Sequence, residues 1–306
     1  MIKVDSCNNA RNLDFETMIE KIITHPGGAH KDEFLACAIL LAEHDIPVLR
    51  QDPTEEDLSN PSIAVIDVGL RHEPDLNNFD HHQFARDAKP TCSLSLVLDH
   101  YGIYEDALSF CPWLEVAEWF DCRGPKDTSE WLGVDRETVG KLNSPLDITI
   151  LQAFAKSAQH LSGEPIWELM KMIGGELLQY IRNLRFRIEE VAKVAEVWEI
   201  NDEKDCFKVM FVPRDQNQIE EVSGAMGWHI KELGVEEEVL AMVYPDSRGE
   251  GYGMKRFNDR TEMDFSKIAN EARVRFAHAR GFIAKVEPAE IDELKQLLSK
   301  AYSAIN

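Results

Sequence analysis

An almost uninterrupted apolar stretch at residues 62–68 (SIAVIDV) constrains the fold of this chain more than any other feature. A strand with apolar side chains on both faces is typical of a parallel sheet that is covered by helices on both sides. Short strand patterns at 21–24 (KIIT) and 48–51 come before it, and a helix pattern at 32–44 (DEFLACAILLAEH) separates those two. This strand–helix–strand order predicts a parallel α/β sheet with right-handed crossovers.

The rest of the chain continues with helices and then repeats the alternation. Helices are expected at 93–101, 113–120, 148–161 and 165–197. From Cys206 onward we expect strands at 206–213, 238–245 and 251–257, and helices at 219–233, 265–273 and 289–304. The fold class is therefore α/β, with a first domain at 1–160, a helical connector at 161–205 and a smaller α/β domain at 206–306.

The chain is acidic, and its charge is unevenly distributed. Its 55 acidic and 33 basic residues give a formal net charge of −22, which argues against wrapping of long nucleic acid and against an anionic membrane surface. Residues 206–306 hold 14 basic and 17 acidic side chains, so −3 falls there and −19 on residues 1–205. Within 251–285 the sign reverses to +4, from 8 basic and 4 acidic residues, which is a first indication of a local anion site.

Membrane and disulfide signals are weak in this sequence. The longest apolar run, at 34–42, has 9 residues, well short of the roughly 20 that span a bilayer. The six cysteines show no C-x-x-C spacing and are typical of reduced thiols, so a cytoplasmic location is expected. Cys111 and Cys122 are favoured as core residues over a shared metal site.

Histidine and aspartate gather at the expected strand ends. Six of the ten histidines lie in the first 82 residues. Because ligands of open α/β sheets bind at the carboxyl ends of strands, four segments are expected to converge. The segments are HPGGAHKDE with His25, His30 and Asp32, the strand end at Asp67, FDHHQ with Asp80, His81 and His82, and WFDCRGP with Asp121.

Each segment has an ordinary structural interpretation: a glycine turn, a surface histidine pair or a capping aspartate. Their combination favours a metal site instead. Mixed His and Asp ligands suit Mn²⁺, Zn²⁺ or Fe²⁺, and the share of carboxylates favours Mn²⁺. The sequence contains neither a GxxxxGK[ST] phosphate loop nor a GxSxG esterase turn.

These four ordered motifs resemble those of the DHH phosphoesterase superfamily. The spacing His-x4-His-x-Asp-Glu in the first motif and the late segment FAHARGFI at 276–283 are most similar to the melanocyte-proliferating-gene family of metal-dependent nucleases. That family is also called the metal-dependent protein hydrolase family. The resemblance runs from about residue 21 to 285. It implies a DHH-like catalytic domain at 1–160 and a substrate-binding domain at 206–306.

The resemblance also implies roles for individual residues. It implies two divalent cations, expected to be Mn²⁺ with Mg²⁺, Zn²⁺ or Fe²⁺ as alternatives. One cation is assigned to His25, His30 and Asp67, and the other to Asp32, Asp67, His81 and Asp121. His82 would contact the phosphoryl group or protonate a leaving oxygen, and Asp80 would orient a histidine. The substrate would be bound by His278, Arg280, Gly281 and Arg256.

The expected activity is metal-dependent hydrolysis of phosphodiester bonds in short RNA or small nucleotides, like that of a 3′–5′ exonuclease. A small cationic segment suits a few phosphates rather than a long duplex. The alternatives are a pyrophosphatase or mononucleotide phosphatase, and a metal- or nucleotide-binding regulatory module without turnover. Peptide hydrolysis has little support, since the sequence has no HExxH helix. The sequence is compatible with a homo-oligomer.

Overall fold

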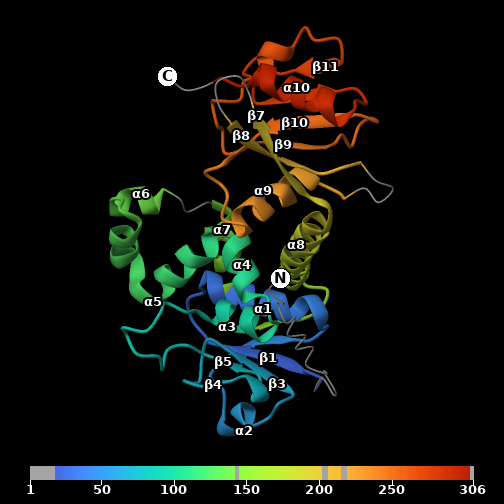
Figure 1. Cartoon of the computed structure of the whole chain (residues 1–306). Helices are drawn as coiled ribbons and strands as arrows, with labels where there is room; N and C mark the ends of the chain where they lie inside the picture. The colour runs from blue at the N-terminus through green and yellow to red at the C-terminus, as the bar shows by residue number, and fades with distance from the viewer. Residues whose placement is uncertain (1–17, 142–144, 202–205, 215–218, 304–306) are drawn as a thin grey trace, which may run out of the picture. The chain divides into compact units, whose positions relative to one another are not determined.

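The computed structural model describes residues 18–141, 145–201, 206–214 and 219–303 (Figure 1). The chain divides into two compact units, Met1–Arg182 and Asn183–Asn306. The boundary falls inside helix α8 (Pro165–Val194), within the helical connector expected at 161–205. None of the described helices has the length and apolar composition needed to cross a bilayer.

A six-stranded sheet forms the centre of the first unit. Its order is β4 (His72–Glu73), β5 (Asn78–Phe79), β3 (Ile63–Ile66), β1 (Lys21–Thr24), β2 (Val48–Arg50) and β6 (Gln159–His160). The four inner strands are parallel, as predicted, whereas the outer strands β4 and β6 run antiparallel to their neighbours. All four residues of β3 are buried, which agrees with the apolar stretch at 62–68.

The first unit also contains helices, some of which pack against the strands of this sheet (Figure 1). They are α1 (Lys31–Glu43), α2 (Glu55–Leu58), α3 (Ser93–His100), α4 (Tyr104–Phe110), α5 (Trp113–Leu132), α6 (Arg136–Gly140), α7 (Pro145–Ala155) and the first part of α8, with a 3-10 turn η1 (Pro74–Leu76). Helix α1 buries nearly all of its residues because it packs against β3 and also against α3, α5 and α7. The Trp167 indole of α8 donates to the carbonyl oxygen of Ile46 over 2.8 Å, which ties α8 to the start of β2.

Two helices of the first unit differ from the sequence prediction. The helix expected at 113–120 continues to Leu132 across a kink at Gly124, where φ is 74° and ψ is 173°. This backbone conformation is essentially restricted to glycine. Gly124 therefore marks a kink inside α5 and not the end of the helix. The helix expected at 148–161 ends at Ala155, because Gln159 and His160 pair with β2 as an edge strand.

A second six-stranded sheet forms the second unit. Its order is β11 (Val274–Ala277), β12 (Ile283–Val286), β10 (Tyr252–Arg256), β9 (Val239–Pro245), β8 (Cys206–Phe211) and β7 (Glu196–Asn201). Only β8 and β9 are parallel, and α9 (Val222–Glu232) connects them; the other neighbours are antiparallel. Helix α10 (Ile291–Ala301) and the 3-10 turn η2 (Phe265–Ile268) contribute to the apolar core on this sheet.

Two helix predictions that concern the second unit need correction. The helix expected to reach residue 197 ends at Val194, and the next residues form β7. In its sequence EVWEIN, Trp198 and Ile200 face the core, while Val197 and Glu199 lie on the opposite face of the strand and are exposed. The helix expected at 265–273 is only the turn η2, and the segment at 277–286 forms the end of β11, a turn and β12.

Candidate metal centre

Three parallel strands bring their carboxyl ends, and the residues after them, to one edge of the first sheet. His25 directly follows β1, and Asp67 directly follows β3. The segment with Asp80, His81 and His82 directly follows β5. Asp67 adopts a left-handed backbone conformation (φ 59°), and its amide donates to the carbonyl oxygen of Phe79 over 3.1 Å. The hydrogen bonds between β3 and β5 therefore continue one residue beyond β3 and place Asp67 beside His81 and His82.

Helices supply the other expected ligands. His30 is the N-cap residue of α1, and Asp32 lies in the first turn of that helix. Asp121 lies inside α5, which corrects the expectation that it stands at a strand end. Leu114, Glu118 and Asp121 are spaced at four and three residues, so they share the face of α5 that is turned toward the core.

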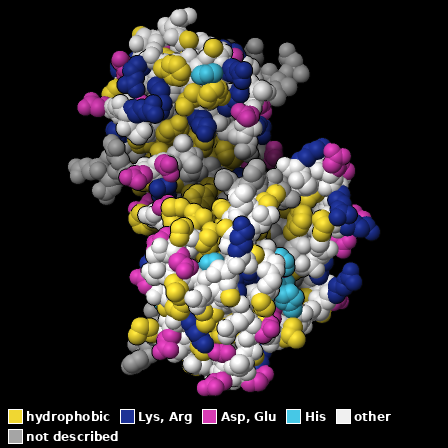
Figure 2. All heavy atoms as spheres, turned by 180° about the vertical axis from the view of Figure 1, so that it is seen from behind, with side chains coloured by type: hydrophobic (Ala, Val, Ile, Leu, Met, Phe, Trp, Pro, Cys, Tyr) yellow, Lys and Arg dark blue, Asp and Glu magenta, His cyan; other side chains and the backbone are white. Residues whose placement is uncertain are grey.

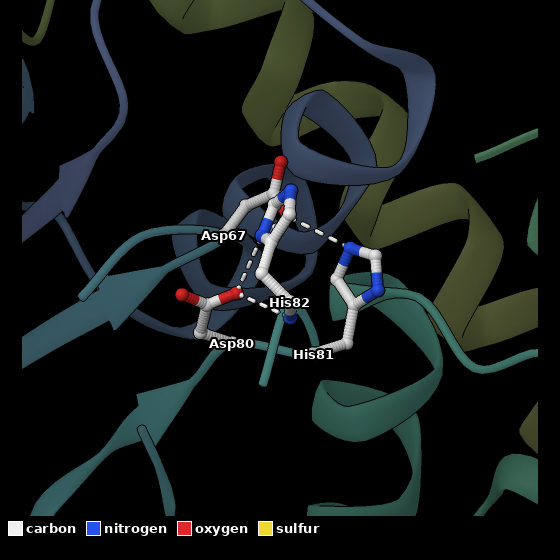
Figure 3. A group of neighbouring side chains, drawn as sticks. All are labelled: Asp67, Asp80, His81 and His82. Carbon is white, nitrogen blue, oxygen red and sulfur yellow. Dashed lines mark hydrogen bonds and ion pairs between the residues drawn. The ribbon is translucent and has the colours of Figure 1, made fainter. Parts of the chain in front are cut away.

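The structure brings all eight of these residues together. Four overlapping groups have potential ligand atoms within 4.8 Å of one another. The groups are Asp67, Asp80, His81 and His82; His25, His30 and Asp67; His81, Asp121 and Cys122; and His30, Asp32 and Asp121. Figure 3 shows the first of them, with both histidines beside the two carboxylates. Shared members make the groups a continuous cluster rather than separate sites.

Asp67 lies at the centre of the cluster. Its Oδ1 is 3.2 Å from Nε2 of His81, and its Oδ2 is 3.5 Å from Nε2 of His25. The His81 Nε2 is also 2.8 Å from Oδ2 of Asp121. The His30 Nδ1 is 3.8 Å from Oδ1 of the same Asp121 carboxylate. One carboxylate that presents an oxygen to each side is the arrangement expected of a ligand shared by two cations.

Buried polar atoms that make no hydrogen bond show that the cluster fits a cation. Among the described residues, five polar atoms of the cluster are buried and make no hydrogen bond of acceptable geometry. They are His25 Nε2, Asp32 Oδ1, Asp67 Oδ2, His81 Nε2 and Asp121 Oδ2. Buried polar atoms of this kind are rare in folded proteins and call for a partner. Imidazole nitrogen and carboxylate oxygen together are a donor set suited to a divalent transition metal.

The electrostatics of the cluster favour positive charge. Burial, together with the charges of Asp67 and Asp121, raises the pKa of Asp32 well above its usual range. Burial acts to lower the pKa of His81, but its contacts with Asp121 and Asp67 outweigh this effect and raise the pKa to about 12. Contact with Glu33 raises the pKa of His25 to about 9. Crowded carboxylates therefore stabilise any cation that enters.

Asp80 orients His82. The buried Asp80 carboxylate accepts hydrogen bonds from the amide of Leu70 (2.7 Å) and the amide of His82 (3.0 Å). Its Oδ1 is also 2.7 Å from Nδ1 of His82. Burial acts to raise the pKa of Asp80, but these hydrogen bonds outweigh it and lower the pKa. The His82 side chain is 51 % exposed, so an oriented imidazole faces solvent at the edge of the cluster.

The cluster reaches the surface of the first unit. Side-chain exposure is 58 % for His30 and 51 % for His82, whereas Asp67 is fully buried. Figure 2 shows histidine side chains at the surface of this unit, in the lower part of the view. Buried ligands beneath partly exposed imidazoles leave the cluster accessible to a small ligand.

Ser93 and Cys122 also lie at the site. Ser93 was not identified from the sequence, and Cys122, expected in the core, is only partly buried and forms a potential ligand group with His81 and Asp121. The Ser93 hydroxyl donates to Oδ1 of Asp67 over 2.9 Å. Cys122 Sγ lies 3.7 Å from Nδ1 of His81 and donates to the carbonyl oxygen of Thr91 over 3.3 Å. Nothing in the local sequence marks Ser93, while the position of Cys122 directly after Asp121 was an available signal.

Glu33 and Arg50 also contact the cluster. Oε2 of the buried Glu33 is 2.7 Å from Nε2 of His25, and its other oxygen pairs with Arg50 over 3.2 Å. Glu33 ends the HPGGAHKDE motif, so its sequence position was a usable signal. Arg50, the last residue of β2, carried no such signal.

The substrate-binding residues expected from the late segment lie in the second unit. Arg256 ends β10, and its Nε is 3.4 Å from Oδ1 of Asp259. His278, Arg280 and Gly281 form the turn between β11 and β12, in which the Gly281 amide donates to the carbonyl oxygen of His278 over 2.8 Å.

The backbone conformation and surroundings of Gly281 explain why glycine is required at this position. Its φ is 68°, and a Cβ atom at this position would lie 1.9 Å from Oδ1 of Asp264. The Asp264 carboxylate accepts hydrogen bonds from the amide and hydroxyl of Ser266. A neighbouring carboxylate therefore occupies the space that glycine leaves beside this turn.

The fold and the cluster define an α/β domain that carries a candidate metal site at the carboxyl ends of its strands. Residues 21–106 match the family model MYG1_exonuc, described as Uncharacterised protein family (UPF0160). This part of the chain is therefore similar to that family, in agreement with the resemblance to the melanocyte-proliferating-gene nucleases over these residues. The match contains the cluster residues from His25 to Ser93 but not Asp121. No curated protein matches the chain.

Proposed function

We propose that this protein is a two-metal phosphodiesterase that acts on short RNA or small nucleotides in the manner of a 3′–5′ exonuclease. The observation that carries the proposal is the convergence of His25, His30, Asp32, Asp67, His81 and Asp121, whose potential ligand atoms form overlapping groups within 4.8 Å and include five buried atoms without a hydrogen bond. The match of residues 21–106 to a family named for an exonuclease supports the same conclusion.

We assign the ligands of two Mn²⁺ ions to these residues. His25, His30 and Asp67 would hold one ion, and Asp32, Asp67, His81 and Asp121 the other. A pair of such cations activates water for in-line attack on phosphorus and stabilises the attacking and leaving oxygens. Two dications and the three carboxylates among their proposed ligands leave a charge of about +1. The Glu33–Arg50 pair adds none, and the charge of Asp80 is balanced when its partner His82 carries the proton of the proposed acid. The loaded site would therefore attract phosphate in spite of the acidic chain.

His82 is the proposed acid at this site. Asp80 holds its Nδ1 at 2.7 Å, so the imidazole has a defined orientation while more than half of the side chain remains exposed. An imidazole in this position can contact a phosphoryl oxygen or give a proton to the leaving oxygen. Asp80 acts through His82 and does not itself need to touch the substrate.

The second unit is the proposed binding site for the rest of the substrate. Figure 2 shows Lys and Arg side chains grouped on the visible face of this unit. Arg256, His278 and Arg280, with Gly281 in the same turn, are the candidates for contacts with a few phosphates. We do not expect binding of extended DNA or of membranes, and a homo-oligomer is compatible with this function. A cytoplasmic location is part of the proposal and rests on the cysteine spacing.

Substrate profiling with the full chain tests the proposal. Oligoribonucleotides of graded length, dinucleotides, mononucleotides and pyrophosphate are incubated with and without Mn²⁺. Multiple turnover of short RNA that requires Mn²⁺ is expected. Release of phosphate only from pyrophosphate or from mononucleotides would establish a different phosphatase. Saturable nucleotide binding without any product would establish a regulatory module.

Variants connect this activity to the cluster. Asp67→Asn and His81→Ala should each reduce turnover by at least about 100-fold, because each removes a proposed ligand of the reacting centre. His44→Ala is the matched control: it removes a histidine of the same unit at the opposite end of α1 and should leave turnover unchanged. Metal-dependent activity that survives both cluster variants would contradict the assignment.

A further inference from the structure

Arg50 is a buried arginine at the carboxyl end of β2 that contacts the loop between β1 and α1. Its guanidinium donates to the carbonyl oxygens of Gly27 and Gly28, both over 3.1 Å. It also donates to Oε1 of Glu33 over 3.2 Å, and it lies 4.7 Å from the centre of the Phe154 ring. One planar, multidentate donor thus holds two carbonyl groups and one carboxylate at the same time.

The loop held by Arg50 carries two of the proposed metal ligands. His25 precedes Gly27, and His30 follows Gly28 by two residues. Gly27 has φ of +94°, and a Cβ atom at either glycine would have no neighbour within 4 Å. The two glycines have no side chains that could pack against the rest of the unit. The position of the loop backbone therefore depends on contacts that other residues make to it.

Glu33 connects Arg50 to both His25 and His30 through hydrogen bonds and ion pairs. It is fully buried, accepts from the hydroxyl of Thr24 over 3.0 Å, and accepts from the amide of His30 over 3.1 Å. Its Oε2 lies 2.7 Å from Nε2 of His25. Because Arg50 pairs with the other oxygen, it orients the carboxylate that touches the His25 ring and the His30 backbone.

We propose that Arg50 is a positioning residue for one of the two metal positions, the one assigned to His25, His30 and Asp67. This inference rests on the proposed function, since it assumes that the cluster holds two cations. The other position takes Asp32, Asp67, His81 and Asp121, none of which lies in the loop between Gly27 and His30. Loss of Arg50 should therefore weaken one metal position far more than the other.

The test is a Mn²⁺ titration of the full chain by calorimetry, with electron paramagnetic resonance of the bound ion. The wild type should bind two ions with the exchange-coupled spectrum of a close pair. Arg50→Met should lower affinity at one position by about 10–100-fold, the range measured for groups that orient metal ligands. At intermediate Mn²⁺ it should give the hyperfine-split spectrum of an isolated ion. Lys21→Met, which removes the lysine at the start of β1 that pairs with Asp57, is the control and should bind as the wild type does.

Arg50→Met leaves Glu33 as a buried charge without its partner, which can impair folding. Two further variants keep the test decisive in that case. Arg50→Lys retains the charge but lacks the planar fork, so it should fold and still weaken one position. Arg50→Met/Glu33→Gln removes both charges, and its comparison with Glu33→Gln alone isolates the contacts to the loop carbonyls.

The outcomes separate this inference from the proposed function. A wild type that binds no Mn²⁺ overturns the metal proposal and the inference with it. A wild type that binds two ions, with folded Arg50 variants that also bind both at unchanged affinity, overturns the role of Arg50 alone. Equal weakening at both positions, in proportion to a lower melting temperature, would likewise show that Arg50 only stabilises the fold.

Discussion

The hydroxyl of Ser93 donates a hydrogen bond to Oδ1 of Asp67 over 2.9 Å, and both residues are buried. Ser93 is the first residue of α3, and its amide also lies 3.3 Å from Oδ2 of Asp32. The amino end of a helix favours nearby negative charge. Helix α3 therefore holds the Asp67 carboxylate by one oxygen, while the other, Oδ2, accepts no hydrogen bond and lies 3.5 Å from Nε2 of His25.

Ser93→Ala should lower Mn²⁺ affinity by about 10-fold, because Asp67 loses the donor that fixes its orientation. Calorimetric titration measures this loss. Ser59→Ala, which removes an exposed hydroxyl at the end of α2, is the control and should bind like the wild type. Unchanged affinity in a folded Ser93→Ala protein would show that the ligand geometry does not depend on this hydrogen bond.

Cys122 should be protected from alkylation by bound metal. Its Sγ lies 3.7 Å from the imidazole of His81, and the thiol is only partly buried. A cation held by His81 and Asp121 would occupy the space beside this thiol. Peptide mass spectrometry after limited maleimide labelling should show slower reaction of Cys122 with Mn²⁺ present. Cys206, exposed at the start of β8, is the internal control. Equal labelling of Cys122 in both conditions would argue against metal at His81.

Two adjacent glycines of α8 should respond oppositely to substitution. A Cβ atom at Gly174 would lie 1.9 Å from the carbonyl oxygen of Ala38 in α1, whereas one at Gly175 would meet nothing within 4 Å. Gly174→Ala should destabilise the fold by about 1–3 kcal/mol through overpacking against backbone. Gly175→Ala should stabilise it by about 0.5–1 kcal/mol, the usual gain in a helix. Urea unfolding of both variants checks the contrast, and equal shifts would contradict this close approach.

The stability of the first unit should decrease in acid through Asp57. Hydrogen bonds from Thr54, helped by Lys21, lower the pKa of Asp57 from 3.8 to about 2. A lowered folded-state pKa means that the stabilisation is complete above the unfolded pKa and is lost as the pH falls through the folded value. The shift corresponds to about 2 kcal/mol for this mostly buried carboxyl.

Asp57→Asn provides the measurement. Urea unfolding at a series of pH values should show the wild type more stable by about 2 kcal/mol at pH 7, with the difference vanishing between about pH 4 and pH 2. A difference that stays constant over this range would mean that the ionised form of Asp57 contributes nothing. Thr54→Ala should reduce the same difference, since it removes the hydroxyl that donates to the carboxylate.

Local sequence patterns correctly predicted elements such as a strand buried on both faces and a helix with an acidic first turn. The apolar run at 62–68 forms β3, buried on both faces, and the acidic start of α1 agrees with its helix dipole. Patterns failed where partners lie far away in the chain. The 265–273 segment has helical spacing but forms only a short turn. Residues 198–201 alternate as in a half-buried strand, but they directly follow the long helical pattern at 165–197, which extends into β7.

The sequence by itself determined the α/β class and the residue types of the candidate site. Parallel strands place their carboxyl ends together, so the sequence alone predicts that His25, Asp67 and His81 meet. Only the tertiary structure decided which groups hold them: Ser93 for Asp67, and Arg50 for the glycine loop. Hydrogen bonds between residues about twenty or more positions apart leave no local pattern, since they depend on how strands and helices pack rather than on their periodicity.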